Sequence, residues 1–233
     1  MLRRLTPALH AGTAGVSLPH GAQGTRRDAH RSFDPSLVGA LECSAWVAYY
    51  RRDWLAFLTA AVRVSRHVFG LSWRTTIQCS WLVLRANQLW APANGNGVQR
   101  SRRMMERFYA IVQGLYEEPF DPASAAALEI EWWRVHRDHQ LSGREGSSPE
   151  LADALARLYA HVYSVPQRTV TAAAQQRALA MRHSDQWVRA GCDPSSELID
   201  LERAALVRSY SALLAAVRQR PDNSEGTHHD RDL

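Results

Sequence analysis

The first candidates for chemistry in this sequence are two histidines, three residues apart, in a stretch with helical periodicity. On the apolar face formed by Trp132 and Val135, His139 falls near the centre and His136 to one side. Residues three apart are neighbours on a helix, so both imidazoles could bind one metal ion, haem iron or substrate. The alternative is structural: His139 bonds a neighbouring helix in the core, and Glu129 orients His136.

An arginine and an aspartate interrupt the apolar face of the helix expected over 167–190. Arg177 and Asp185 are two turns apart, so they need not pair with each other. A buried arginine must find a carboxylate, a phosphate or several carbonyl groups. Two interpretations stay open: an ion pair with Glu202 on the last expected helix, or an arginine that binds an anionic ligand.

A third polar group falls on the stripe of the helix expected over 73–90. Gln88 lies in that stripe, where it would join a buried amide network or orient a ligand. The pattern predicts a central helix whose core-facing stripe consists of Trp73, Ile77, Trp81 and Leu84.

Together these groups favour a protein that binds a small molecule in an internal polar pocket. The molecule could be anionic, and the protein could also act on it as a catalyst. The catalytic candidates are His136, His139 and Asp185, and the ligand-binding candidates are Gln88, Arg177 and Glu129. Two alternatives are a non-enzymatic regulatory or scaffolding protein and a haem- or metal-dependent helical enzyme. The pattern names neither a cofactor nor a metal.

Sequence motifs narrow the classes of function further. The chain lacks the phosphate-binding, dinucleotide-binding, zinc-protease and serine-hydrolase patterns, and its one Glu-x-x-His run lies at 225–228 in the tail. The three cysteines are far apart, without a Cys-x-x-Cys pair. This spacing excludes a disulfide scaffold and a zinc ribbon, and it favours a reducing cytoplasm.

The chain has 28 basic and 23 acidic residues, which give a net charge of +5. All 28 basic residues are arginines, and the chain contains no lysine. A basic binding face would select arginine only at that face and leave lysine elsewhere in the chain. The complete absence of lysine therefore indicates a coding bias and disfavours a nucleic-acid partner. Arg100, Arg103 and Arg107 gather on the outer side of one expected helix, as a solvated ridge or as a surface for an acidic protein partner. The eight tryptophans predict an aromatic core or an aromatic-lined cavity.

Capping residues before prolines predict where several helices begin. They stand at Asp34-Pro35, Asp121-Pro122, Ser148-Pro149 and Asp193-Pro194. Gly70 and Gly191 are placed to end helices. About eight helices follow, over 35–50, 54–69, 73–90, 98–115, 122–140, 149–164, 167–190 and 195–218.

The fold class is therefore all-α, a single bundle over 34–220. Residues 1–33 are expected to be a disordered leader, with a transit peptide or a start codon placed too far upstream as alternatives. Residues 221–233 are expected to be a disordered tail. No apolar run approaches the roughly 18 residues that a membrane span needs.

Overall fold

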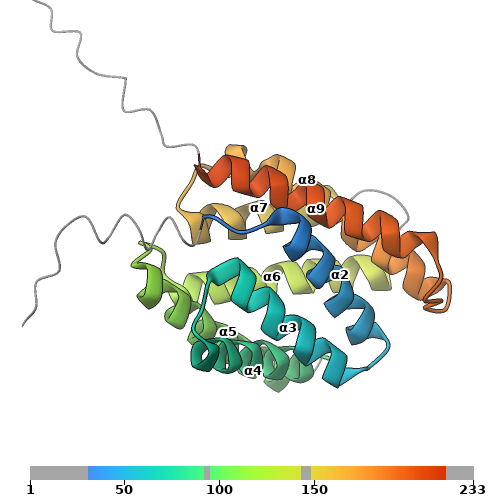
Figure 1. Ribbon diagram of the computed structural model, residues 1–233, viewed down its shortest axis with the longest axis horizontal. Helices are drawn as coiled ribbons and strands as arrows, with labels where there is room; N and C mark the ends of the chain where they lie inside the picture. Colours follow the sequence, from blue (N-terminus) through green and yellow to red (C-terminus); the bar gives the residue numbers. More distant parts are fainter. Residues whose placement is uncertain (1–30, 92–94, 143–147, 219–233) are drawn as a thin grey trace, which may run out of the picture.

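The computed structural model describes residues 31–91, 95–142 and 148–218, and every regular element in these ranges is an α-helix (Figure 1). The helices are α2 (Pro35–Tyr50), α3 (Trp54–Phe69), α4 (Trp73–Trp90), α5 (Gly95–Tyr116), α6 (Pro122–Leu141), α7 (Pro149–Tyr163), α8 (Gln167–Arg189) and α9 (Glu197–Arg218). The predicted all-α bundle is confirmed. No helix in the described ranges is both long and apolar enough to cross a membrane.

Three of the four predicted proline starts begin helices. The side chains of Asp34, Asp121 and Ser148 each accept a hydrogen bond from a backbone N–H of the first turn of α2, α6 and α7. The fourth prediction is wrong. The Asp193 carboxylate accepts a hydrogen bond from the Ser195 backbone N–H in a turn, and the Asp193 backbone carbonyl accepts one from the Trp187 indole at 2.7 Å. Asp193 therefore belongs to a turn, and α9 begins only at Glu197.

Two segments expected to be irregular belong to the folded part. Gly95 to Gly97, which precede the helix expected over 98–115, form the first turn of α5. Residues 31–33, assigned to the leader, pack against the bundle: Phe33 is buried, and Arg31 binds the buried Glu118 carboxylate and the carbonyl of Tyr163. The rest of the leader and the tail lie outside the described residues.

The helices form a closed ring of neighbours. Each described helix packs against the next one along the chain, and α9 packs against α2, which closes the ring. In Figure 1, α7 to α9 lie in the upper part and α3 to α5 in the lower part. Such an arrangement buries one large core cluster and two smaller ones between the helices, and it places inward-facing groups of distant segments close together.

The contact between α2 and α9 depends on a glycine. A Cβ atom at Gly39 would lie 2.8 Å from both the backbone nitrogen and Cγ2 of Val207, closer than packed atoms approach. We expect Gly39→Ala to lower the free energy of unfolding by about 1–3 kcal/mol, despite the better helix propensity of alanine. Urea unfolding followed by circular dichroism measures this effect.

Gly114 in α5 is the matched control because a Cβ atom there meets no atom within 4 Å. Gly114→Ala should stabilise the protein by roughly 0.5–1 kcal/mol through helix propensity alone. A Gly39→Ala variant that gains stability to the same extent would contradict the close approach of the two helices.

The apolar stripe predicted on α4 faces outward, which corrects the expectation of a central helix. Trp73, Ile77 and Trp81 expose 60%, 60% and 55% of their surface, although Leu84 is buried. The buried side combines apolar residues, such as Leu82, with polar ones, among them Thr76 and Ser80. Thr76 Oγ1 donates to the carbonyl of Ser72 at 2.8 Å, and Ser80 Oγ donates to Ser65 Oγ of α3 at 3.5 Å. The small size of both residues lets α3 and α4 approach.

Candidate functional site

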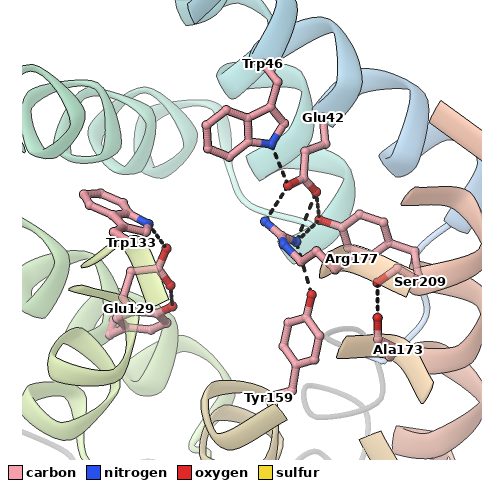
Figure 2. A network of polar contacts seen from close by, with 10 residues as sticks. Glu42, Trp46, Glu129, Trp133, Tyr159, Ala173, Arg177 and Ser209 are labelled. Atoms are coloured by element: carbon pink, nitrogen blue, oxygen red, sulfur yellow. Dashed lines mark hydrogen bonds and ion pairs between the residues drawn. The ribbon is translucent and has the colours of Figure 1, made fainter. Parts of the chain in front are cut away.

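The centre of the ring holds a buried ion pair between two helices that are distant in sequence. The guanidinium of Arg177 in α8 binds the Glu42 carboxylate of α2, with one contact of 3.2 Å from Nη1 to Oε2. Tyr210 of α9 donates its hydroxyl proton to the same carboxylate, and the Trp46 indole donates at 3.2 Å. Figure 2 shows the Trp46 indole and the Arg177 guanidinium converging on the Glu42 carboxylate.

Two tyrosines complete the surroundings of the guanidinium. Arg177 Nη1 donates to the hydroxyls of Tyr159 at 3.2 Å and Tyr210 at 3.3 Å. Burial alone would lower the pKa of Arg177, but the Glu42 carboxylate outweighs that effect and holds the pKa well above its ordinary value. The arginine is thus a fixed cation whose charge is balanced by Glu42.

A second carboxylate lies across from this ion pair. Glu129 of α6 accepts hydrogen bonds from the Tyr109 hydroxyl at 2.7 Å and from the Trp133 indole at 3.0 Å. Burial raises the pKa of Glu129, and the Tyr109 hydrogen bond and the Arg177 charge oppose that rise. In the close-up, Glu129 and Trp133 lie on one side and Arg177 with Glu42 on the other (Figure 2).

A cavity of about 240 Å³ separates the two polar groups, and every described helix contributes to its wall. Most of the lining is apolar or aromatic. The aromatic residues are Trp46, Phe57, Phe69, Phe108, Tyr109, Trp132, Trp133, Tyr159, Tyr163 and Tyr210, and the charged ones are Glu42, Glu129 and Arg177. An engineered apolar cavity of about 150 Å³ binds benzene, so this space is large enough for a small ring compound.

One N–H donor of a residue on the cavity wall has no hydrogen-bond acceptor among the described residues: Nε of Arg177, which is buried. The Trp132 indole instead lies near the Glu129 carboxylate, whose pKa it helps to lower. The guanidinium carbon of Arg177 lies 5.6 Å from the centroid of the Trp132 ring, so the two side chains belong to one region of the wall. A buried donor without an acceptor is costly, and an oxygen atom of a bound molecule would satisfy it.

The predicted residues His136 and Asp185 meet in a separate cluster. His136 Nε2 lies 3.1 Å from Asp185 Oδ1, and Gln140 Nε2 donates to the same oxygen at 2.6 Å. The Gln140 amide also donates to the Tyr50 hydroxyl at 2.8 Å. The spaces that His136 lines measure only about 10 and 50 Å³, room for a few water molecules at most. This cluster ties α2, α6 and α8 together.

Glu202 of α9 is almost fully buried near that cluster, and its Oε2 has no hydrogen-bond partner. Burial raises the pKa of Glu202 to about 8, and the charges of Glu42 and Asp185 act in the same direction. The predicted ion pair between Arg177 and Glu202 is therefore wrong: the arginine binds Glu42, and Glu202 is held as a neutral acid at neutral pH.

The structure separates the six predicted site residues into three groups. Arg177 and Glu129 line one cavity, and His136 pairs with Asp185 outside it. His139 and Gln88 join neither group: His139 is partly exposed, and Gln88 accepts from Arg85 at 2.6 Å. His136 is buried and His139 is not, the reverse of the prediction. The buried side of α6 includes Trp133, so it is rotated toward His136 and away from His139.

Sequence reasoning missed Glu42, although a signal was present. Glu42 is the only charged residue in α2, a helix that is otherwise apolar or weakly polar. An isolated acid on such a helix must be solvated at the surface or paired inside. Its partner is 135 positions away, and no spacing rule connects the two residues.

Within the part of the chain that the structure describes, no three His, Cys, Asp or Glu side chains gather closely enough to hold a metal ion. Arg100, Arg103 and Arg107 are exposed on α5, and their binding of an acidic protein stays a prediction, as does the cytoplasmic location. No protein-family model matches the chain, and no curated protein or solved structure does either. The chain is thus an α-helical bundle with an aromatic-lined cavity between its helices.

Proposed function

We propose that the protein binds a small, largely apolar ring compound in the cavity between Glu129 and Arg177, and that the compound presents a neutral oxygen acceptor to the wall. The observation that carries this proposal is a cavity of about 240 Å³ with a largely apolar and aromatic wall, which includes Arg177 with its unpartnered Nε. Ligand sites commonly combine an apolar lining with a few placed polar groups.

The charges of the wall favour a neutral acceptor over an anion. The Arg177 charge is compensated by Glu42, and Glu129 adds a second carboxylate whose hydrogen bonds come from neutral groups, Tyr109 and Trp133. A ligand carboxylate would therefore meet no uncompensated cation among the described wall residues. The proposal concerns binding only, since the His136–Asp185 pair lies outside the cavity.

Calorimetric titration with three probes of one size tests the proposal. Benzamide offers a neutral oxygen acceptor, benzoate an anion and benzylamine a cation. We expect benzamide to bind most tightly.

Ala61→Leu is expected to abolish binding of the probes because Ala61 lines the cavity and the larger side chain occupies it. Leu151→Ala is the control, since Leu151 is buried in the same core but does not line the cavity. It should lower the melting temperature and leave the dissociation constant unchanged. Equal binding of benzamide by the wild type and Ala61→Leu would refute the proposed site, and tighter binding of benzoate would refute its selectivity.

A further inference from the structure

The outer side of the α3–α4 hairpin carries large apolar side chains that no other described helix covers. Trp73, Ile77 and Trp81 follow one another at intervals of four residues on α4, and Leu55 of α3 is 77% exposed. The guanidinium carbon of Arg66 in α3 lies 4.3 Å from the centroid of the Trp73 ring, so the two helices share this side. Leu55, Trp73, Ile77 and Trp81 are called the α3–α4 face below.

The charge around the face is predominantly positive, although the exposed Asp53 and Glu106 border the segment that forms it. From 54 to 105 the sequence contains seven arginines and neither aspartate nor glutamate. Arg63 and Arg74 are exposed on α3 and α4, beside the face. The helices that α4 packs against are α3 and α5, and beyond the acid-free stretch α5 adds the exposed Glu106 and Arg107.

Charge and shape together decide which occupant fits. A second copy in a twofold interface would bring the same arginines face to face, which like-charge repulsion opposes. A protein partner usually anchors side chains in pockets. The cavities described above, and a further one between α7 and α8, are lined by residues other than Trp73, Ile77 and Trp81. Single-stranded nucleic acid would use the tryptophans for stacking but would leave Ile77 and Leu55 without a role.

We propose that the α3–α4 face docks on the surface of a bilayer that contains anionic lipids. Tryptophans prefer the boundary between headgroups and acyl chains, and a helix with apolar residues on one side and arginines beside them lies in that boundary. Trp73, Ile77 and Trp81 enter this layer, and Arg63 and Arg74 lie at the level of the lipid phosphates. A bilayer needs no pocket on the protein and accepts a face of this width.

Vesicle sedimentation with the full chain tests this proposal. The probes are vesicles of phosphatidylcholine alone and of phosphatidylcholine mixed with phosphatidylglycerol. We expect binding to the mixed vesicles only, weakened by added salt. Trp73→Ser with Trp81→Ser should weaken binding at least about tenfold by removing interfacial apolar area. Arg63→Glu with Arg74→Glu should do the same, at about fivefold or more for each arginine removed.

The matched controls lie on the opposite part of the ring. Leu201 is an exposed apolar residue of α9, and Arg168 is an exposed arginine of α8; both helices lie away from α3 and α4 (Figure 1). Leu201→Ser and Arg168→Glu should change vesicle binding less than twofold. Tryptophan emission should shift to shorter wavelength when the wild type meets mixed vesicles, and this shift should disappear in the variant without Trp73 and Trp81.

Four results would overturn the proposal. The first is equal binding to vesicles without anionic lipid, and the second is a loss of binding in the control variants as large as in the face variants. The third is a change of oligomeric mass in analytical ultracentrifugation when the tryptophans are replaced. The fourth is tight binding of a single-stranded oligonucleotide that the same replacements abolish. The last two would assign the face to a second copy or to nucleic acid. Melting curves of all variants show whether they are folded.

Discussion

Replacing Arg177 with methionine is expected to lower the free energy of unfolding by about 3–5 kcal/mol, the cost of leaving a buried carboxylate without its cation. Glu42 would keep its hydrogen bonds from Tyr210 and Trp46 but lose the charge that balances it. Because the free energy of unfolding of a native protein is only about 5–15 kcal/mol, this substitution removes a large part of the stability. Urea unfolding followed by tryptophan fluorescence measures it.

The double variant Glu42→Gln with Arg177→Met separates the ion pair from mere packing. It removes both charges, while the glutamine oxygen still accepts from the Trp46 indole and its NH2 group can donate to the Tyr210 hydroxyl, so it should recover most of the lost stability. It also keeps the prediction testable if Arg177→Met alone does not fold. A double variant as unstable as the single one would show that the ion pair does not explain the loss.

Arg157→Met is the matched control on the surface. Arg157 pairs with Asp153 one turn earlier on α7, at 3.1 Å, and both side chains are exposed. Exposed pairs of this kind contribute less than about 1 kcal/mol because water and salt screen them. The difference between the two methionine variants therefore measures what burial adds to the arginine–carboxylate pair.

A second large effect is expected from Glu202 as a dependence of stability on pH. Burial raises the pKa of Glu202 to about 8 in the folded protein, against 4.5 for an ordinary glutamate. Between these values the folded state binds a proton that the unfolded state has lost, so the free energy of unfolding falls as pH rises. The slope is about 1.4 kcal/mol for each pH unit, with no contribution below pH 4.5 and a constant penalty above pH 8.

Glu202→Gln should remove this slope and stabilise the protein at pH 8 by several kcal/mol, because the amide stays neutral at every pH. The measurement is the difference between variant and wild type in urea unfolding at pH 5 and pH 8, which cancels the other titrating groups. Glu106→Gln, at an exposed position on α5, is the control and should show no such difference. A difference between Glu202→Gln and the wild type that does not grow with pH would exclude a neutral buried acid.

Local signals in the sequence determined most of the secondary structure. Capping side chains before prolines placed the starts of α2, α6 and α7, and Gly70 ends α3 in the left-handed conformation. These signals act through hydrogen bonds and backbone angles within a few residues, so they can be recognised without knowledge of the fold. The start of α9 was misplaced because Asp193 uses the same side-chain chemistry to form a turn.

Helix faces were determined less well, because the sequence shows periodicity but not which neighbour covers a face. On α4 the most apolar stripe is exposed, and the buried side holds Thr76 and Ser80, whose hydroxyls bond locally or to α3. On α6 the buried side includes Trp133 and His136 instead of His139. Close approach between helices selects small residues, and periodicity alone does not reveal that selection.

The sequence by itself therefore determined an all-α bundle, the positions of its helices and the need of Arg177 for a buried partner. Only the tertiary structure decided that the partner is Glu42, that Glu129 faces it across a cavity, and that His136 and Asp185 form a separate cluster. The reason is physical: the burial of a charge is a local cost that the sequence shows, whereas its compensation comes from whichever distant helix the closed ring brings alongside.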